Sequence, residues 1–275
     1  MSCGDSENAM STALLTLPKA AAFLDAENQP DADIACLLTH CPWLDIVERH
    51  AYADWRNPGL TARADALKRA GFRIHQTWSG RRPGAHKNTA DGYMARGIGE
   101  TLCRRPDIPV VMMVSGDAYF VPLAGQLHQQ GITVIVAADP LRASRPLLRA
   151  ADQYLPLGHL AQQIIMLDRL ERANRYLTFS FVPQRAPIRA TELERMIHKG
   201  LVIQEEVYRP GRGTRPEVRL NRQSYVVRTV LSAVAQVSPG ALMLDGRLYD
   251  ERGCLRYAGL TAWPAGTPST LPVCD

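Results

Sequence analysis

The sequence predicts an α/β protein with a parallel sheet of about five to six strands flanked by helices, followed by a smaller α+β region. Over roughly the first 158 residues, short apolar runs of strand length alternate with helix-like segments, which indicates a parallel sheet covered by helices. Gly71 and Gly131 each lie between an expected helix and the next apolar run, where a left-handed helix C-cap is expected. Beyond residue 158 this alternation is lost.

The sheet region is expected to begin near Lys19. Residues 1–18 are small and polar, without sustained periodicity, and are typical of a poorly ordered leader. The expected strands are Ala20–Leu24, Ile46–Ala53, Phe72–His75, Val110–Val114 and Ile132–Ala137, with a sixth short one around Gln153–Leu157. The expected helices between them are Ile34–Leu38, Leu60–Ala70, Thr89–Cys103 and Val121–Gln130. This domain is expected to span residues 19–158.

The second part of the chain is expected to form a connecting segment, residues 159–183, and a small basic domain, residues 184–275. The connection is predicted as an amphipathic helix at Leu160–Tyr176 and a strand at Thr178–Val182. The small domain is predicted to hold a helix at Thr191–Lys199 and a hairpin of Leu201–Tyr208 and Glu217–Leu220. Between the hairpin strands lies the basic, Gly-rich segment Arg209-Pro-Gly-Arg-Gly-Thr-Arg-Pro216. A helix followed by such a hairpin resembles a winged-helix element, although a surface hairpin with arginines for solubility would look the same. After Val234, many Gly and Pro residues predict irregular structure or a frayed tail.

Composition indicates a folded protein and excludes several classes. Hydrophobic residues make up 46% of the chain and charged residues 21%, which fits a globular domain. No apolar run approaches the ~20 residues that a membrane-spanning helix needs, and Met10–Leu17 lacks the basic flank of a secretory signal, so a cytoplasmic location is expected. The six cysteines form no Cys-x-x-Cys pair, so the sequence suggests neither a zinc cluster nor a disulfide framework.

The charge is unevenly distributed along the chain. The net charge is +5, and residues 159–275 carry all of the excess, with 16 basic and 11 acidic side chains. A mild basic excess is by itself weak evidence for nucleic-acid binding, because charged side chains mostly form a solvated surface. It gains meaning only beside a site.

Aspartates directly follow four of the expected strands. Asp25, Asp54, Asp117 and Asp139 follow the first, second, fourth and fifth strands. The ends of parallel strands share one edge of the sheet, and ligands bind there where the strand order reverses. Any one of these residues is more often a turn former, so the signal is the coincidence of several.

Clustered carboxylates repel one another and require protonation or a cation. Mg²⁺ or Mn²⁺ prefers oxygen ligands, keeps several waters and leaves room for phosphates. Such an ion lowers the pKa of bound water and stabilises charge on a scissile phosphate. Phosphodiester hydrolysis is therefore the chemistry that this pattern favours.

Three motifs carry a resemblance to a known family. Phe23-Leu-Asp25-Ala-Glu-Asn28 resembles the Asp-x-x-Asn motif that opens NYN domains, and Ser115-Gly-Asp117-Ala-Tyr-Phe120 resembles their Ser-Gly-Asp-x-Asp-Phe motif. Lys87-Asn-Thr-Ala-Asp91 resembles the helix start between them. The order and spacing, together with Tyr52-Ala-Asp54-Trp55 and Leu148-Arg-Ala-Ala-Asp152, are similar to the LabA-like branch of the PIN-like nuclease superfamily. The resemblance covers roughly Lys19 to Leu157.

The resemblance implies a PIN-like sheet with strand order 3-2-1-4-5, with Asp25 and Asp117 side by side at the switch point. It also implies metal-dependent cleavage of RNA, with Mg²⁺ or Mn²⁺ bound by Asp25, Asp91 and Asp117, which would also activate water. Asn28, Lys87 and Ser115 are expected to contact the substrate or position the metal ligands. Ser115 is not expected to be a nucleophile, because no His and acid partner accompanies it in a nucleophile-elbow pattern.

Two positions depart from the family pattern and keep an alternative open. Tyr119 and Gly97 stand where the family usually has acids. The alternative is a catalytically weakened NYN module that binds RNA or a protein partner without cleaving it. A nucleotide-binding protein or small-molecule phosphatase ranks third, because no Gly-rich phosphate loop is present. In either of the first two cases Arg209, Arg212 and Arg215 are expected to bind RNA phosphates. Assembly into a homo-oligomer stays open.

Overall fold

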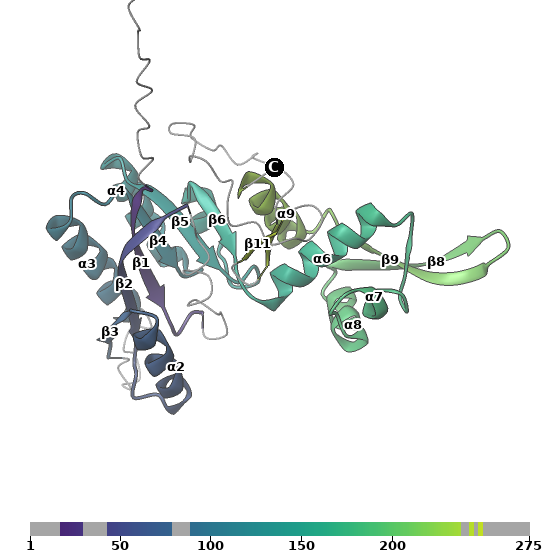
Figure 1. Cartoon of the computed structure of the whole chain (residues 1–275), viewed down its shortest axis with the longest axis horizontal. Helices are drawn as coiled ribbons and strands as arrows, with labels where there is room; N and C mark the ends of the chain where they lie inside the picture. The colour runs from purple at the N-terminus through teal and green to yellow at the C-terminus, as the bar shows by residue number, and fades with distance from the viewer. Residues whose placement is uncertain (1–16, 30–42, 79–88, 238–241, 245–246, 250–275) are drawn as a thin grey trace, which may run out of the picture.

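The computed structural model describes residues 17–29, 43–78, 89–237, 242–244 and 247–249. Two regions lie side by side in it, a helix-covered sheet and a smaller region built around a long hairpin (Figure 1). The expected leader, residues 1–18, lies outside the described residues except for Leu17 and Pro18, and the expected helix Ile34–Leu38 and the expected substrate residue Lys87 lie outside them as well. No helix within the described ranges is both long and apolar enough to cross a membrane.

The first region contains a parallel sheet of six strands. In chain order they are β1 (Lys19–Asp25), β2 (Asp45–Ala53), β3 (Arg73–Gln76), β4 (Val110–Val114), β5 (Thr133–Ala138) and β6 (Gln153–Pro156). The spatial order is β3-β2-β1-β4-β5-β6, which confirms the predicted fold class and the predicted order, with the sixth strand beside the fifth. The order reverses between β1 and β4, so the switch point lies at the carboxyl ends of these two strands.

Helices cover both faces of this sheet because its central strands are apolar on both sides. The covering elements are α2 (Pro58–Arg69), α3 (Thr89–Arg104), the short 3₁₀ helix η1 (Ala118–Phe120), α4 (Val121–Gln129) and α5 (Arg145–Ala150). Alternate side chains of a strand point to opposite faces. Leu24 of β1 accordingly packs in the core beneath α2, whereas Phe23 packs with Met94 and Ile98 of α3. The helices on both faces thus help to hold the loops at the carboxyl edge of the sheet in place.

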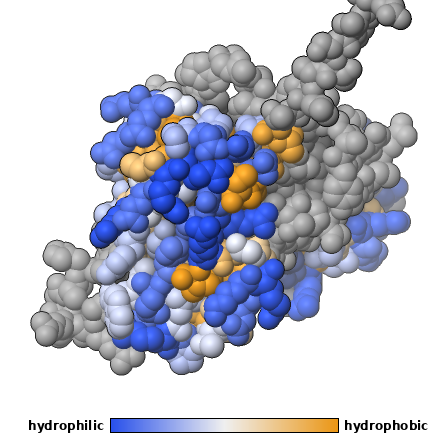
Figure 2. Space-filling model, turned by 60° about the vertical axis from the view of Figure 1, so that its left-hand side comes forward, coloured by the Kyte–Doolittle hydropathy of each residue, from blue (hydrophilic) through white to orange (hydrophobic). Residues whose placement is uncertain are grey.

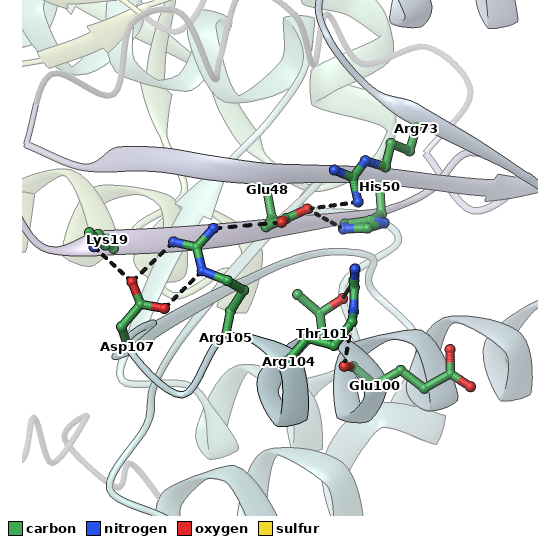
Figure 3. A network of polar contacts seen from close by, with 9 residues as sticks. All are labelled: Lys19, Glu48, His50, Arg73, Glu100, Thr101, Arg104, Arg105 and Asp107. Carbon is green, nitrogen blue, oxygen red and sulfur yellow. Dashed lines mark hydrogen bonds and ion pairs between the residues drawn. The ribbon is translucent and has the colours of Figure 1, made fainter.

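A buried polar network fastens β2 to its neighbours (Figure 3). Glu48 of β2 is 8% exposed and lies 3.3 Å from Arg73 and 3.8 Å from Arg105. His50 Nε2 lies 3.2 Å from the same carboxylate, and its Nδ1 lies 2.9 Å from Nε2 of His75. Burial and the neighbouring His75 lower the pKa of His50 to about 4, so His50 is neutral at pH 7. A buried acid needs such partners to be tolerated, so we assign these histidines to packing and pairing.

The second region has its own antiparallel sheet and core. Its elements are α6 (His159–Ala173), β7 (Leu177–Thr178), α7 (Val182–Arg185), α8 (Ala190–His198), β8 (Val202–Arg209), β9 (Gly213–Leu220) and α9 (Tyr225–Val237). The sheet order is β7-β9-β8. Apolar side chains of α6, α8, the hairpin and α9 form one cluster that includes Ile164, Leu193, Val218 and Val227. The order helix, strand, two helices and hairpin agrees with the winged-helix element that the sequence resembles.

Three expectations for this region were wrong. The predicted strand Thr178–Val182 is reduced to β7, because Val182 already begins α7 and Pro183 suits a first helical turn. The predicted hairpin tip is mostly strand: β8 runs to Arg209 and β9 starts at Gly213, which leaves only residues 210–212 outside the strands. The expected irregular structure after Val234 is wrong for the residues described there, since α9 runs to Val237 and β10 (Leu242–Leu244) pairs antiparallel with β11 (Arg247–Tyr249); residues 250–275 lie outside the described residues.

Helix α9 contacts both regions. Val227 and Val230 belong to the core of the second region, whereas Ala233 belongs to the core on one face of the main sheet, where α9 packs against β6. The guanidinium of Arg145, at the start of α5, lies 4.2 Å from the centre of the Tyr225 ring. This helix therefore joins the two cores.

Candidate functional site

The three aspartates predicted as metal ligands come from three elements that meet at the carboxyl edge of the sheet. Asp25 ends β1, Asp117 follows the adjacent strand β4, and Asp91 lies in the first turn of α3. Leu24 and Val114 are register partners, so the chain leaves β1 and β4 at the same level. The Asp25 and Asp91 side chains share a hydrogen bond, and Asp91 also lies within the electrostatic influence of Asp117. The fold therefore brings these carboxylates together.

Burial makes Asp25 and Asp91 weaker acids than usual. Burial, together with the negative charges of Asp25 and Asp117, raises the pKa of Asp91 to about 7. Burial also raises the pKa of Asp25 to about 6, although hydrogen bonds from the Asn28 and Glu27 amides and from Ser115 act in the opposite direction. Each acid is thus harder to ionise than in water, because a second carboxylate and little solvent surround it. A cation at this edge would relieve that penalty.

Hydrogen bonds hold Asp25 in one orientation. Its Oδ1 accepts the backbone N–H groups of Glu27 at 3.2 Å and Asn28 at 3.0 Å. Its Oδ2 accepts the Ser115 hydroxyl at 3.3 Å, and the same hydroxyl oxygen accepts the Asp117 N–H at 3.3 Å. Ser115 thus links the two motif loops.

Asn28 connects the same two loops. Its Oδ1 accepts the Gly116 N–H at 2.9 Å and the Gln29 side-chain amide at 2.6 Å. In this arrangement the amide oxygen of Asn28 holds the loop after β4 beside β1. Gly116 has no room for a side chain, since a Cβ there would overlap the backbone of Arg142 and Ala143. The Ser-Gly-Asp sequence therefore allows close packing of the backbone at this loop.

The two departures from the family pattern have structural causes or consequences. A Cβ at Gly97 would overlap the phenol of Tyr52, with its Cζ only 2.9 Å away. An acid at position 97 is excluded because β2 places a tyrosine against that turn of α3. Tyr119 extends from η1 with its ring 40% exposed, and its hydroxyl lies 3.7 Å from where a Cβ of Gly92 would stand. Its phenol thus reaches the start of α3, beside Asp91.

The remaining acids at this edge mainly support loops. Asp54 accepts two hydrogen bonds from the Arg56 guanidinium and one from Gln76 at 2.8 Å. Asp139 accepts the Leu141 N–H at 2.8 Å, as an Asp in a turn does. Glu27 is different: its carboxylate accepts the Asp54 N–H at 2.6 Å, and its charge raises the pKa of both Asp25 and Asp91. The sequence offers Glu27, Asp54 and Asp139 as acids that could compensate for those missing at positions 97 and 119, although none occupies the missing motif position. Of these three, Glu27 is the one whose charge acts on both Asp25 and Asp91.

The donor set suits a hydrated hard cation better than a fully caged metal. Among the described residues, no three His, Cys, Asp or Glu side chains are arranged to enclose an ion by themselves. Mg²⁺ commonly uses only one or two carboxylates, with waters and substrate phosphates as its other ligands. The Asp25 and Asp91 pair, with Asp117 nearby, fits that mode. It does not fit zinc, which prefers histidine and cysteine.

The three arginines of the hairpin differ in how far they are available. Arg209 forms two hydrogen bonds of 2.8 Å with Glu217 and lies over the Tyr176 ring. Arg212 donates to the Tyr176 hydroxyl, and Arg215 donates to the carbonyl oxygen of Arg212 at 3.1 Å. Neither Arg212 nor Arg215 has an acidic partner in an ion pair among the described residues, and both are exposed.

A cavity of about 180 Å³ lies in the second region, away from Asp25, Asp91 and Asp117. The end of α6 and the hairpin strands line it with Glu171, Arg175, Glu205 and Arg219 among others. Because acidic and basic groups alternate around it, we assign it no ligand.

Comparison with known proteins addresses the sheet region. No curated protein matches the chain. A solved structure of a protein of unknown function from Vibrio parahaemolyticus is 24% identical, with a TM-score of 0.45, and the match covers 51% of this chain and 93% of that one. The family model of the NYN domain matches residues 19–159, just over half of the chain, and this range contains all six strands of the parallel sheet together with Asp25, Asp91 and Asp117. The chain belongs to the NYN domain family.

Proposed function

We propose that this protein is a ribonuclease that hydrolyses RNA phosphodiester bonds with Mg²⁺ or Mn²⁺ held by Asp25, Asp91 and Asp117. The observation that carries the proposal is the buried Asp25–Asp91 pair beside Asp117, at the switch point of the sheet. Buried acids with perturbed pKa values in a shared site are typical of functional centres. Membership of the NYN family, which belongs to the PIN-like nucleases, supports the reaction class.

Each residue has a defined task in this proposal. The ion, when bound, lowers the pKa of a water ligand and neutralises charge that develops on the phosphate. Asp25 serves as the fixed ligand, because two backbone amides and Ser115 orient it before any ion arrives. Asp91 and Asp117 complete the negative surface from α3 and η1. Lys87 is proposed to contact a substrate phosphate, and Asn28 to keep the two motif loops in register.

The second region is proposed to add affinity for RNA. Arg212 and Arg215 are exposed on the hairpin and can neutralise backbone phosphates. Arg209 is expected to contribute less, because Glu217 already neutralises its charge. These contacts would be insensitive to sequence, since phosphates carry no base information.

The test is cleavage of end-labelled RNA by the full chain in Mg²⁺, in Mn²⁺ and in chelator. We expect products only with the ions, and none from Asp91→Asn under the same conditions. Products in chelator, or full activity of the variant, would contradict the assignment.

A second candidate is an NYN module that binds RNA or a protein partner without cutting it. The observation that favours it is the loss of acids at positions 97 and 119, where Tyr52 packs against Gly97 and Tyr119 replaces a carboxylate. The same experiment decides between the two, because tight RNA binding without any ion-dependent product would establish this second function.

A further inference from the structure

The exposed aromatic and large apolar side chains are concentrated around the carboxylate edge. Figure 2, which brings the left-hand side of Figure 1 forward, shows apolar residues on that face of the molecule only in small separate patches. Six large apolar or aromatic side chains are exposed in the described residues. Four of them, Trp78, Tyr93, Tyr119 and Leu141, lie just after β3, β4 or β5 or in the first turns of α3. This edge therefore offers individual exposed side chains, three of them rings, and not a broad apolar surface.

The guanidinium of Arg56 lies over one face of the Trp78 ring, and Asp54 holds that guanidinium in place. Its side chain is 56% exposed, and the Arg56 guanidinium carbon lies 4.5 Å from the ring centre. Asp54, itself 8% exposed, accepts from Arg56 Nε at 2.7 Å and from Nη2 at 2.5 Å. Gln76 in turn donates to Asp54 at 2.8 Å. An aromatic ring that is already ordered on one face loses little entropy when a second flat group stacks on it.

The two exposed rings follow strands on opposite sides of β1, the strand that carries Asp25. Trp78 follows β3, which is two strands from Asp25 on β1, a lateral distance of about 10 Å at the usual strand spacing. On the other side, Tyr119 lies two residues beyond Asp117, and its hydroxyl reaches Gly92, next to Asp91. A nucleic-acid strand that crosses the carboxylates would therefore pass an exposed ring on each side.

We propose that Trp78 and Tyr119 stack on unpaired bases on either side of the scissile phosphate, so that the site takes single-stranded RNA and not duplex. The inference rests on the proposed ribonuclease function for the identity of the strand. In a duplex the faces of the bases are already stacked on their neighbours, so these rings have nothing to bind. Stacking tolerates any base, and the site therefore selects strandedness more than sequence.

The test measures binding of the full chain to a short labelled RNA, alone and annealed to its complement, in Ca²⁺ to slow cleavage. Wild type is expected to prefer the single strand. Trp78→Ala and Tyr119→Ala should each weaken single-strand binding by roughly 5- to 140-fold, the usual range for one lost stacking contact, with little change for duplex. Trp78→Phe and Tyr119→Phe, which keep a ring, should retain most of the affinity.

Leu141→Ala is the matched control, because it removes an exposed apolar side chain from the same edge but no ring. It should bind as wild type does. Equal affinity for single strand and duplex, or alanine variants that are folded and bind normally, would overturn the inference. The proposed function is tested separately. If the wild type cleaves RNA with the ions but the alanine variants bind RNA normally, only the stacking inference is contradicted. If the binding pattern is as expected but no RNA is cleaved, only the proposed ribonuclease activity is contradicted.

Discussion

The carboxylate edge of the sheet and the basic hairpin of the second region both carry charge, but they carry it in opposite ways. At the edge, Asp25 and Asp91 are buried, lie against each other and have raised pKa values. On the hairpin, Arg209 and Arg219 are each paired with a glutamate of the neighbouring strand. Local partners explain the second arrangement but not the first. Buried acids that have no ion-pair partner among the described residues, in a place where their charge costs stability, are therefore the better guide to function.

Removing one carboxylate from the edge should have the largest effect. Asp117→Asn keeps the shape of the side chain but removes the charge that the ion needs, so ion-dependent RNA cleavage should fall by at least roughly 10²-fold. The variant should unfold at nearly the wild-type temperature. Asp107→Asn is the control, since Asp107 precedes β4 at the opposite edge, where it pairs with Lys19 and Arg105. Equal losses in both variants would mean that the effect is not specific to the edge.

Substitution of Gly97 tests whether packing against Tyr52 prevents any side chain, and therefore an acid, at this position. Gly97→Ala should destabilise the fold by about 1–3 kcal/mol, because its Cβ overlaps the Tyr52 phenol. Gly99→Ala, in the same helix with nothing within 4 Å, should instead be neutral or stabilising by up to about 1 kcal/mol. Urea denaturation of both variants measures the difference. A Gly97→Ala variant as stable as wild type would show that α3 can move away from β2.

Protons and a metal ion should compete for the carboxylates of Asp25 and Asp91, whereas the hairpin offers no such site among its described residues. The raised pKa values of Asp25, about 6, and Asp91, about 7, mean that the folded protein holds protons there that the unfolded chain has released. The ionised pair therefore destabilises the fold above about pH 7, and this penalty is relieved as the pH falls through that value. Because an ion needs the ionised form, the rise in melting temperature caused by Mn²⁺ should be larger at pH 8 than at pH 6. A rise that does not depend on pH would place the ion elsewhere.

Substitutions on the hairpin should have the smallest effect on RNA binding, and the effect should differ between Arg209 and the other two arginines. On single-stranded RNA, each lost phosphate contact reduces the slope of log affinity against log salt by roughly 0.7. Changing Arg212 and Arg215 together to Ser should flatten the slope by about 1.4, whereas Arg209→Ser should change it little because Glu217 neutralises Arg209. Salt titrations of binding in Ca²⁺ provide the measurement. Parallel lines for wild type and the double variant would remove the hairpin from the RNA interface.

The sheet was predictable because its signals are local. Buried parallel strands appear as continuous apolar runs, such as Val110–Val114, and the aspartates at their ends follow directly in the sequence. The helix Tyr225–Val237 was missed although it is amphipathic and apolar, since the Gly and Pro residues beyond it suggested irregular structure.

The features that the sequence did not reveal depend on contacts between distant residues. The exclusion of a side chain at Gly97 requires Tyr52, which lies on another element. The pairing of Arg209 with Glu217 depends on the register of the hairpin, in which Arg209 stands opposite Gly213. Neither spacing nor composition specifies such contacts.

The position of α9 has a practical consequence for anyone who wishes to study the NYN region by itself. A fragment that ends at Leu157 would match the family boundary closely, yet it would leave uncovered the side of β6 and α5 against which Ala233 and Tyr225 now pack. Within the described residues, β6 is also the last strand on its side of the sheet, and its outer backbone groups would lie open to other molecules. Edge strands that lose their cover associate with one another. The shortest stable form of the NYN region is therefore expected to include residues through Val237, although they lie far beyond the sheet in sequence.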